Sequence, residues 1–286
     1  MNKIRNLFLV TVLSGFLNTP VYAAIDFDEM SAPQVLQLAK QGHPEAQNKI
    51  ADIYYYGDDE TEQDFDQALM WYEKAAKQDN VDAEYALGLM YDDGEGVEQD
   101  LKKALAYYRK AAQHGSAQAM TNIGYLYENQ KEIPDYHQAF SWYSQAAKLG
   151  EPNALNNLGT FYLHGYAVVK NSKKAVEYYS QAAEQDNALA QYNLGCLYRD
   201  GIGVIQNNKQ ALKWLAKAAE QGNDIAQHNL GFCYANGRGV TKDYVKAAEW
   251  YRKAAEQGYS NSQYNLGHCY EYGEGVTQSK ATAAEW

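Results

Sequence analysis

Cysteine, proline and basic residues are scarce in this sequence of 286 residues. Three cysteines are too few to staple a chain of this length into a disulfide scaffold. Lys and Arg number 25 against 36 Asp and Glu, so the net charge is −11. Such a chain lacks the basic face that nucleic-acid-binding proteins present to phosphates, and we expect no nucleic-acid partner. Five prolines beside 22 glycines indicate helices separated by glycine turns.

Long apolar runs are also absent, apart from a short one near the N-terminus. Residues 7–17 are mostly apolar, Lys3 and Arg5 precede them, and small side chains follow up to Ala23. The run is shorter than the ~20 residues that span a bilayer, and this order of features is typical of a secretory signal peptide. We expect residues 1–23 to be a signal peptide cleaved after Ala23, so that the mature chain is periplasmic or secreted and does not insert into a membrane. An uncleaved membrane anchor is the alternative.

From residue 44 onward the sequence repeats itself. A Leu-Gly or Ile-Gly pair recurs six times, and its glycines are separated by 36, 35, 36, 36 and 36 residues. A second block follows each pair, with an alanine, one or two aromatic residues and then an Ala-Ala pair. Apolar residues three and four apart predict a helix for each block. The sequence therefore predicts an all-α chain of about seven two-helix units over residues 44–286, the last one incomplete, after an N-terminal capping helix within residues 24–43.

Two columns of the repeat predict how the helices begin and end. Four residues before the first alanine of each second helix stands a residue whose side-chain oxygen can accept from free backbone N–H groups: Asp64, Asp100, Asp135, Asn171, Asn207, Asp243 and Ser279. Between the two helices a Gly-x-Gly-Val turn recurs, where glycine permits a positive φ. The glycine of each Leu-Gly pair is expected to let the two helices of a unit approach closely. The carboxylates of the capping column are thus assigned to structure rather than to catalysis.

The repeat resembles the Sel1-like repeat, a relative of the tetratricopeptide repeat. The pattern is Ala-x-Tyr-Asn-Leu-Gly-x-x-Tyr-x-x-Gly-x-Gly-Val, followed by Lys-Ala-x-x-Trp-Tyr-x-Lys-Ala-Ala-x-x-Gly. The resemblance covers residues 44–286 and implies a right-handed α-α superhelix, a solenoid whose units bury their apolar faces by stacking. It also implies that the chain binds proteins. Exported bacterial members of the family are associated with envelope signalling, cell-wall enzyme partners and host contact.

The side of each first helix that faces away from the core is expected to line the concave groove. At 100° per residue, the second, fifth, sixth, ninth, twelfth and thirteenth positions share this side. The sixth position is an asparagine in five repeats. Such an amide can bind the backbone of an extended peptide or bond to the adjacent repeat, and the sequence leaves both open. The candidate binding residues are Asp82, Tyr85, Asp92, Asp93, Asn122, Tyr125, Asn157, Tyr192, Asn193, His228, Asn229, Phe232, Tyr264, Asn265 and His268.

Aromatic side chains among polar groups are common in protein-binding surfaces. The acidic members of the set and the negative net charge predict a basic or neutral protein or peptide partner. A solvated face on which tyrosines merely pack on each other is the plainer alternative. The chain would then be a structural spacer.

Reactive chemistry is not predicted. Cys196, Cys233 and Cys269 are interpreted as buried free thiols, because equivalent positions of stacked helices lie too far apart for a disulfide. His228, His268 and Cys269 are the only histidine–cysteine group to consider, and they lack a metal-ligand spacing. We expect no metal, no cofactor and no catalytic site. A cysteine-rich branch of the family, linked to β-lactam binding or hydrolysis, carries two cysteines in each repeat, which this chain does not. A cell-wall or β-lactam-acting enzyme remains the rival hypothesis.

Overall fold

The computed structural model describes residues 26–27, 30–129 and 133–286. The expected signal peptide, residues 1–23, lies outside this range. The described residues form fifteen α-helices and no strand. The helices are α1 (Ala32–Lys40), α2 (Pro44–Tyr56), α3 (Phe65–Ala76), α4 (Val81–Asp93), α5 (Leu101–Gln113), α6 (Ala117–Glu128), α7 (Tyr136–Lys148), α8 (Pro152–His164), α9 (Ser172–Glu184), α10 (Ala188–Asp200), α11 (Asn208–Glu220), α12 (Asp224–Asn236), α13 (Tyr244–Glu256), α14 (Ser260–Tyr272) and α15 (Lys280–Glu285).

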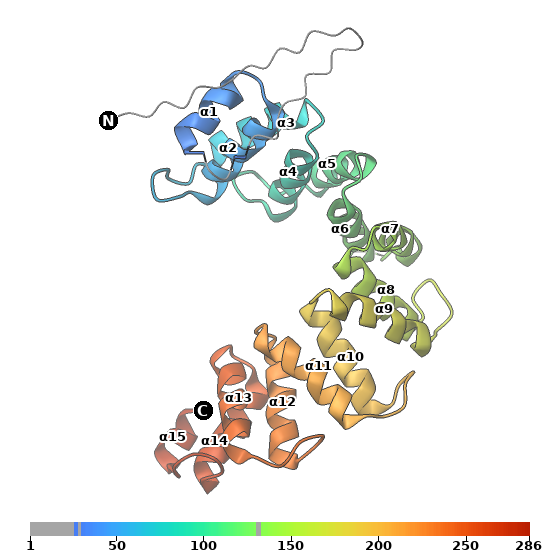
Figure 1. Cartoon of the computed structure of the whole chain (residues 1–286), viewed down its shortest axis with the longest axis vertical. Helices are drawn as coiled ribbons and strands as arrows, with labels where there is room; N and C mark the ends of the chain where they lie inside the picture. The colour runs from blue at the N-terminus through green and yellow to red at the C-terminus, as the bar shows by residue number, and fades with distance from the viewer. Residues whose placement is uncertain (1–25, 28–29, 130–132) are drawn as a thin grey trace, which may run out of the picture.

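The helices pair into antiparallel hairpins that stack in sequence order. Each even-numbered helix from α2 to α12 packs most extensively against the helix that follows it, and the hairpins then pack against their neighbours. The stack follows a C-shaped path, with α4 and α6 on its inner side and α5 and α7 on its outer side (Figure 1). Helix α1 packs on α2 and buries Val35 and Ala39. The predicted all-α solenoid of two-helix units is thus confirmed.

Close contact between the two helices of a hairpin explains the recurring glycine. A Cβ built at Gly124 would stand 2.6 Å from the ring of Tyr143, and one at Gly159 would stand 2.7 Å from the ring of Tyr179. Both tyrosines are buried at the centre of their hairpins, so neither ring has space to move aside. The expected steric role of these glycines is confirmed.

The predicted ends of the second helices are also confirmed. All seven predicted cap residues, from Asp64 to Ser279, accept a hydrogen bond from a backbone N–H of the first turn. In α5, for example, Asp100 Oδ1 accepts from the N–H groups of Lys102 and Lys103. The turn glycines have positive φ, such as 74° at Gly94 and 70° at Gly96. No helix within the described residues combines the length and apolarity needed to cross a bilayer.

Candidate protein-binding face

The fifteen candidate residues all lie on the first helices of the hairpins, from α4 to α14, and none of them is buried. Asp82, Asp93, Tyr125, Tyr264 and His268 are exposed, and the other ten are half-buried. Two of the aromatic members are highly exposed, Tyr125 at 56% and Tyr264 at 73%. A surface of this kind is open to a partner along the whole row of first helices.

The acidic members of the set all lie on α4, with Asp82 at its start and Asp92 and Asp93 at its end. Asp82 and Asp93 make no hydrogen bond or ion pair to the described residues, so their charges face solvent. Asp92 accepts a hydrogen bond from the Tyr108 hydroxyl at 3.0 Å. Burial raises the pKa of Asp92 above its usual value, an effect that the Tyr108 bond opposes. The carboxylates of α4 favour a cationic ligand at this end of the solenoid.

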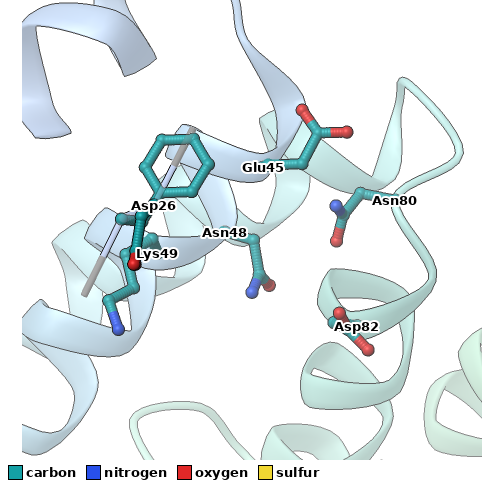
Figure 2. A pocket seen from close by; sticks show the side chains of 7 residues that line it. Asp26, Glu45, Asn48, Lys49, Asn80 and Asp82 are labelled. Atoms are coloured by element: carbon teal, nitrogen blue, oxygen red, sulfur yellow. The ribbon is translucent and has the colours of Figure 1, made fainter. Parts of the chain in front are cut away.

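A cavity of about 340 Å³ lies beside Asp82, between α2 and α4 (Figure 2). Its lining is Asp26, Phe27, Glu45, Asn48, Lys49, Asn80 and Asp82.

The Asn48 amide and the Asp82 carboxylate point into this gap from the two helices. Asn48 Nδ2 donates to Asp52 at 3.3 Å, but its buried Oδ1 has no hydrogen-bond partner among the described residues. An acceptor without a partner is costly when buried, so this oxygen favours a ligand that donates an N–H. The sequence reasoning missed Glu45 and Asn48, although they hold in α2 the positions that Asp82 and Tyr85 hold in α4.

Most asparagines of the sixth position bond to the preceding repeat. Asn122 Nδ2 donates to the Tyr85 hydroxyl at 3.4 Å, and Asn193 Nδ2 donates to Asn156 Oδ1 at 3.0 Å, so both bond to the preceding repeat. Asn157 accepts from Asn156 within its own helix, and Asn265 bonds to Tyr251 of the preceding hairpin. Inter-repeat bonding therefore occupies at least part of this column.

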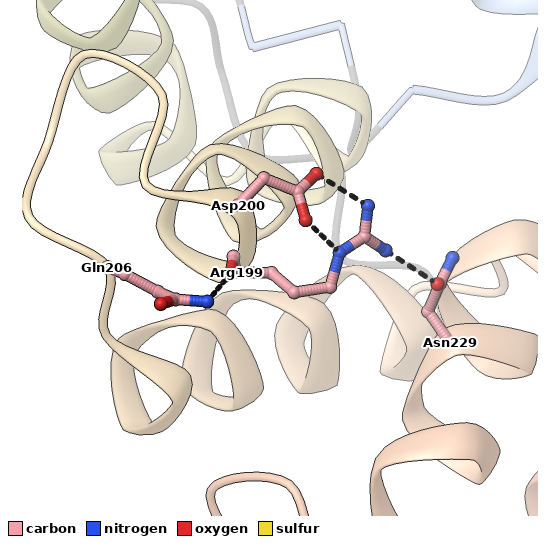
Figure 3. Close-up of polar contacts among 4 residues, drawn as sticks. All are labelled: Arg199, Asp200, Gln206 and Asn229. Carbon is pink, nitrogen blue, oxygen red and sulfur yellow. Dashed lines mark hydrogen bonds and ion pairs between the residues drawn. The ribbon is translucent and has the colours of Figure 1, made fainter.

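Arg199 of the fifth repeat bonds to Asn229 of the sixth repeat (Figure 3). Its guanidinium donates twice to the Asp200 carboxylate, each time at 2.8 Å, and once to Asn229 Oδ1 at 3.0 Å. The Arg199 hydrogen bonds lower the pKa of Asp200 below its usual value, although burial opposes the shift. Gln206 Nε2 donates a hydrogen bond of 2.7 Å to the backbone carbonyl of Arg199. Negative charge at this part of the face is thus paired, unlike that on α4.

The C-terminal part of the face is mainly aromatic. His228 Nδ1 bonds to Ser262 Oγ at 2.8 Å, and burial lowers the pKa of His228. Phe232 lies under the Arg238 guanidinium, 4.8 Å from ring centroid to Cζ. Tyr192 is half-buried, and burial raises its pKa. This part offers flat rings with polar edges, which suits a protein partner.

The thiols and histidines behave only partly as expected. All three cysteines are free, and Cys233 and Cys269 are buried. The expectation that Cys196 is buried is wrong: it is half-buried, because it holds the ninth position of α10, on the groove side, rather than the tenth. His268 Nδ1 lies 3.6 Å from Glu274 Oε2 rather than converging with His228 and Cys269. Within the described residues, potential metal-ligand atoms converge instead at Asp79, Glu84 and His114.

Comparison with solved structures places the chain among solenoid proteins. A protective antigen of uropathogenic Escherichia coli, described as displaying an SLR fold, shares 36% identity over 90% of this chain with a TM-score of 0.77. This chain covers 55% of that protein's length, about half. A Sel1 repeat protein from Oxalobacter formigenes shares 33% identity with a TM-score of 0.72, covering 89% of this chain and 74% of that one.

A third structure is the immunity protein Pa5087 from Pseudomonas aeruginosa, 25% identical with a TM-score of 0.51, over 74% of this chain and 81% of that one. No curated protein matches the chain. The sequence matches the Sel1 repeat in seven consecutive segments: residues 44–80, 81–116, 117–151, 152–187, 188–223, 224–259 and 260–286. The chain therefore belongs to the Sel1 repeat family.

Proposed function

We propose that the chain is an exported, non-enzymatic scaffold that binds an extended, basic or neutral protein segment along its concave face. The observation that carries the proposal is the continuous row of polar and aromatic side chains on the first helices, none of them buried. Sel1 repeats are typically protein-interaction scaffolds, which agrees with it. The carboxylates of α4, and the cavity beside Asp82 in which Asn48 Oδ1 has no hydrogen-bond partner among the described residues, support a Lys or Arg side chain of the partner at this end.

Charge reversal on α4 tests this proposal. Asp82→Lys with Asp93→Lys changes two side chains that the fold does not use, and we expect proteins captured from an envelope extract by the wild-type chain to be lost or bound at least tenfold more weakly. The physical reason is that like charges then face each other across the interface. Adding salt is expected to weaken capture by the wild-type chain, because it screens the attraction. Pull-down and titration with the captured partner measure both effects.

The matched control is Glu184→Lys with Glu220→Lys. These exposed carboxylates lie at the ends of α9 and α11, the second helices, and their replacement changes the net charge by the same amount. Capture is expected to survive in this variant. Equal capture by both double variants, or capture that strengthens with salt, would contradict binding on α4.

Export is a separate part of the proposal and needs its own test. The charged start, the short apolar run and Ala23 support a cleaved leader. The protein expressed in a bacterial host is expected in the periplasm or the medium, with Ala24 as its first residue by mass spectrometry. Replacing Ala23 by a bulky residue such as Trp should block cleavage and leave the longer chain on the membrane. A full-length protein in the cytosol would argue against export.

The inter-repeat bonds of Asn122, Asn193 and Asn229 favour a second candidate, a stiff structural spacer. In this case the asparagines serve rigidity alone. Replacing Asn193 and Asn229 by alanine would then lower the melting temperature without changing partner capture. If the groove uses these amides, capture falls more than stability explains.

A further inference from the structure

In the first, fifth and sixth repeats, a buried glutamine satisfies a backbone carbonyl of the preceding helix and bonds to a second glutamine in a relay. The fourth residue of α2, α10 and α12 is a glutamine: Gln47, Gln191 and Gln227. Each donates from Nε2 at 3.1 Å to the carbonyl of the alanine eight residues earlier. Each also accepts at Oε1, at 2.8 Å, from a glutamine amide some thirty residues later in the chain. The amide is suited to this place because it donates and accepts at once.

The second repeat breaks this relay with two substitutions. Glu84 stands where the glutamine would be, and His114 stands where the second glutamine would be. Glu84 is 1% exposed, and its Oε2 lies 2.8 Å from His114 Nδ1. An ionised carboxylate has no N–H to donate, so Glu84 cannot make the bond to a carbonyl that Gln47, Gln191 and Gln227 make.

A second carboxylate adds to the excess of acceptors. Asp79 lies five residues before Glu84, and in the fifth repeat the equivalent Asp186 receives an N–H from Gln191 at 3.2 Å. In the second repeat Asp79 meets a carboxylate instead. The ligand atoms of Asp79, Glu84 and His114 lie within 4.8 Å of one another. Outside this group, Glu84 makes no hydrogen bond or ion pair with the described residues, although a buried carboxylate requires compensation.

We propose that Asp79, Glu84 and His114 bind a divalent transition metal ion, for which Zn²⁺ is the expected occupant. One imidazole nitrogen and two carboxylate oxygens form a ligand set that Zn²⁺ accepts, with water in the fourth position. Ligand atoms of a tetrahedral zinc lie roughly 3.3–3.6 Å apart at bond lengths of about 2.0–2.2 Å. The Nδ1–Oε2 pair therefore opens slightly, and the exposed Asp79 side chain moves closer. The ion displaces the proton between His114 Nδ1 and Glu84 Oε2, and the proton leaves to solvent.

The consequence is that a bound metal ion cross-links the segments that an amide relay links in the other repeats that carry it. Asp79 belongs to the loop before α4, Glu84 to α4 itself, and His114 to the cap that ends α5. One ion therefore ties the first hairpin, the second hairpin and the loop that leads to the third. Glu84 shares α4 with Asp82 and Tyr85 of the proposed binding face, but the metal site does not depend on that face.

Metal titration of the untagged, chelator-treated chain tests the proposal. We expect one Zn²⁺ per chain by calorimetry, a rise in melting temperature with Zn²⁺, and a visible absorption band with Co²⁺. The decisive variant is Glu84→Gln with His114→Gln. It introduces the glutamine pair of the first, fifth and sixth repeats and is therefore expected to fold. It should bind Zn²⁺ at least about tenfold more weakly and show neither the band nor the shift.

A second variant checks the third ligand. Asp79→Gly introduces the residue found at the equivalent loop position in Gly42, Gly222 and Gly258, all with positive φ, and it should also weaken Zn²⁺ binding. The three cysteines are present in every variant, so binding through thiols would leave the affinity unchanged. Unchanged affinity in the double variant, or a wild-type chain that binds neither Zn²⁺ nor Co²⁺, overturns the proposal and leaves Glu84 and His114 as a simple ion pair.

Discussion

Replacing Gly159 by valine is expected to destabilise the fourth repeat by about 3 kcal/mol, the upper end of what overpacking of a core costs. The added Cβ would overlap Tyr179 Cδ1 and Cε1 at 2.7 Å, and both partners are buried. The Tyr179 ring is only 1% exposed, so relief requires the two helices of the hairpin to separate. Urea unfolding followed by circular dichroism, with hydrogen exchange of α8 and α9, measures the loss and where it falls.

The first repeat offers a matched control for this effect. Ala51 replaces the glycine there, and the buried Tyr72 holds the position of Tyr179. A hairpin can thus be built around one methyl group, so Gly159→Ala should cost less than Gly159→Val, about 1–2 kcal/mol. Ala51→Gly should cost about 1 kcal/mol from helix propensity alone. If Gly159→Val were as stable as the wild-type chain, close helix approach would not be the reason for glycine.

Local repeated features of this fold could be predicted from the sequence. The seven cap residues and the turn glycines each act within a few residues of the chain, so one column of letters specifies one geometry. The pairing of Gly124 with Tyr143 also follows from the repeat, because the five hairpins from α4–α5 to α12–α13 bring the same two columns into contact. A short period makes such columns visible in a single sequence.

Contacts that depend on varied side chains could not be predicted. Whether an asparagine of the sixth position bonds across repeats depends on its neighbour: Tyr85 for Asn122, Asn156 for Asn193, and Arg199 for Asn229. Tyr85 and Asn156 hold the same fifth position of the preceding first helix, but the residue type at that position varies from repeat to repeat. The ends of long side chains decide the pattern, and only coordinates place them.

The Asp79–Glu84–His114 group was overlooked for a different reason. The expected metal ligands were histidine with cysteine, whereas the informative signal was the pair Glu84 and His114 at the two positions that glutamines hold in the first, fifth and sixth repeats. Comparing each buried polar column across repeats would have found it. The misplaced Cys196 has the same origin, since it was grouped with Cys233 and Cys269 by residue type rather than by helix position.

Truncating the tyrosine that faces the glycine is expected to be the most damaging single change in the core. Tyr179→Ala empties the space between α8 and α9, and removal of a buried aromatic ring costs about 3–5 kcal/mol. The hydroxyl adds less, because its bond to Thr160 Oγ1 at 2.9 Å contributes only about 1 kcal/mol. Tyr179→Phe should therefore be mild. Thermal and urea unfolding of the three chains measure the series.

The fifth repeat supplies the variant that separates packing from chemistry. Leu215 holds the position of Tyr179 there, 2.9 Å from where a Cβ at Gly195 would stand. Tyr179→Leu should therefore retain most of the stability that Tyr179→Ala loses, because an apolar side chain of similar reach fills the hairpin. In a stack where each repeat rests on its neighbours, the Ala variant should also expose the flanking α7 and α10 to hydrogen exchange. Protection lost only in α8 and α9 would mean that the hairpins fold independently, contrary to the cooperative stacking that the shared core predicts.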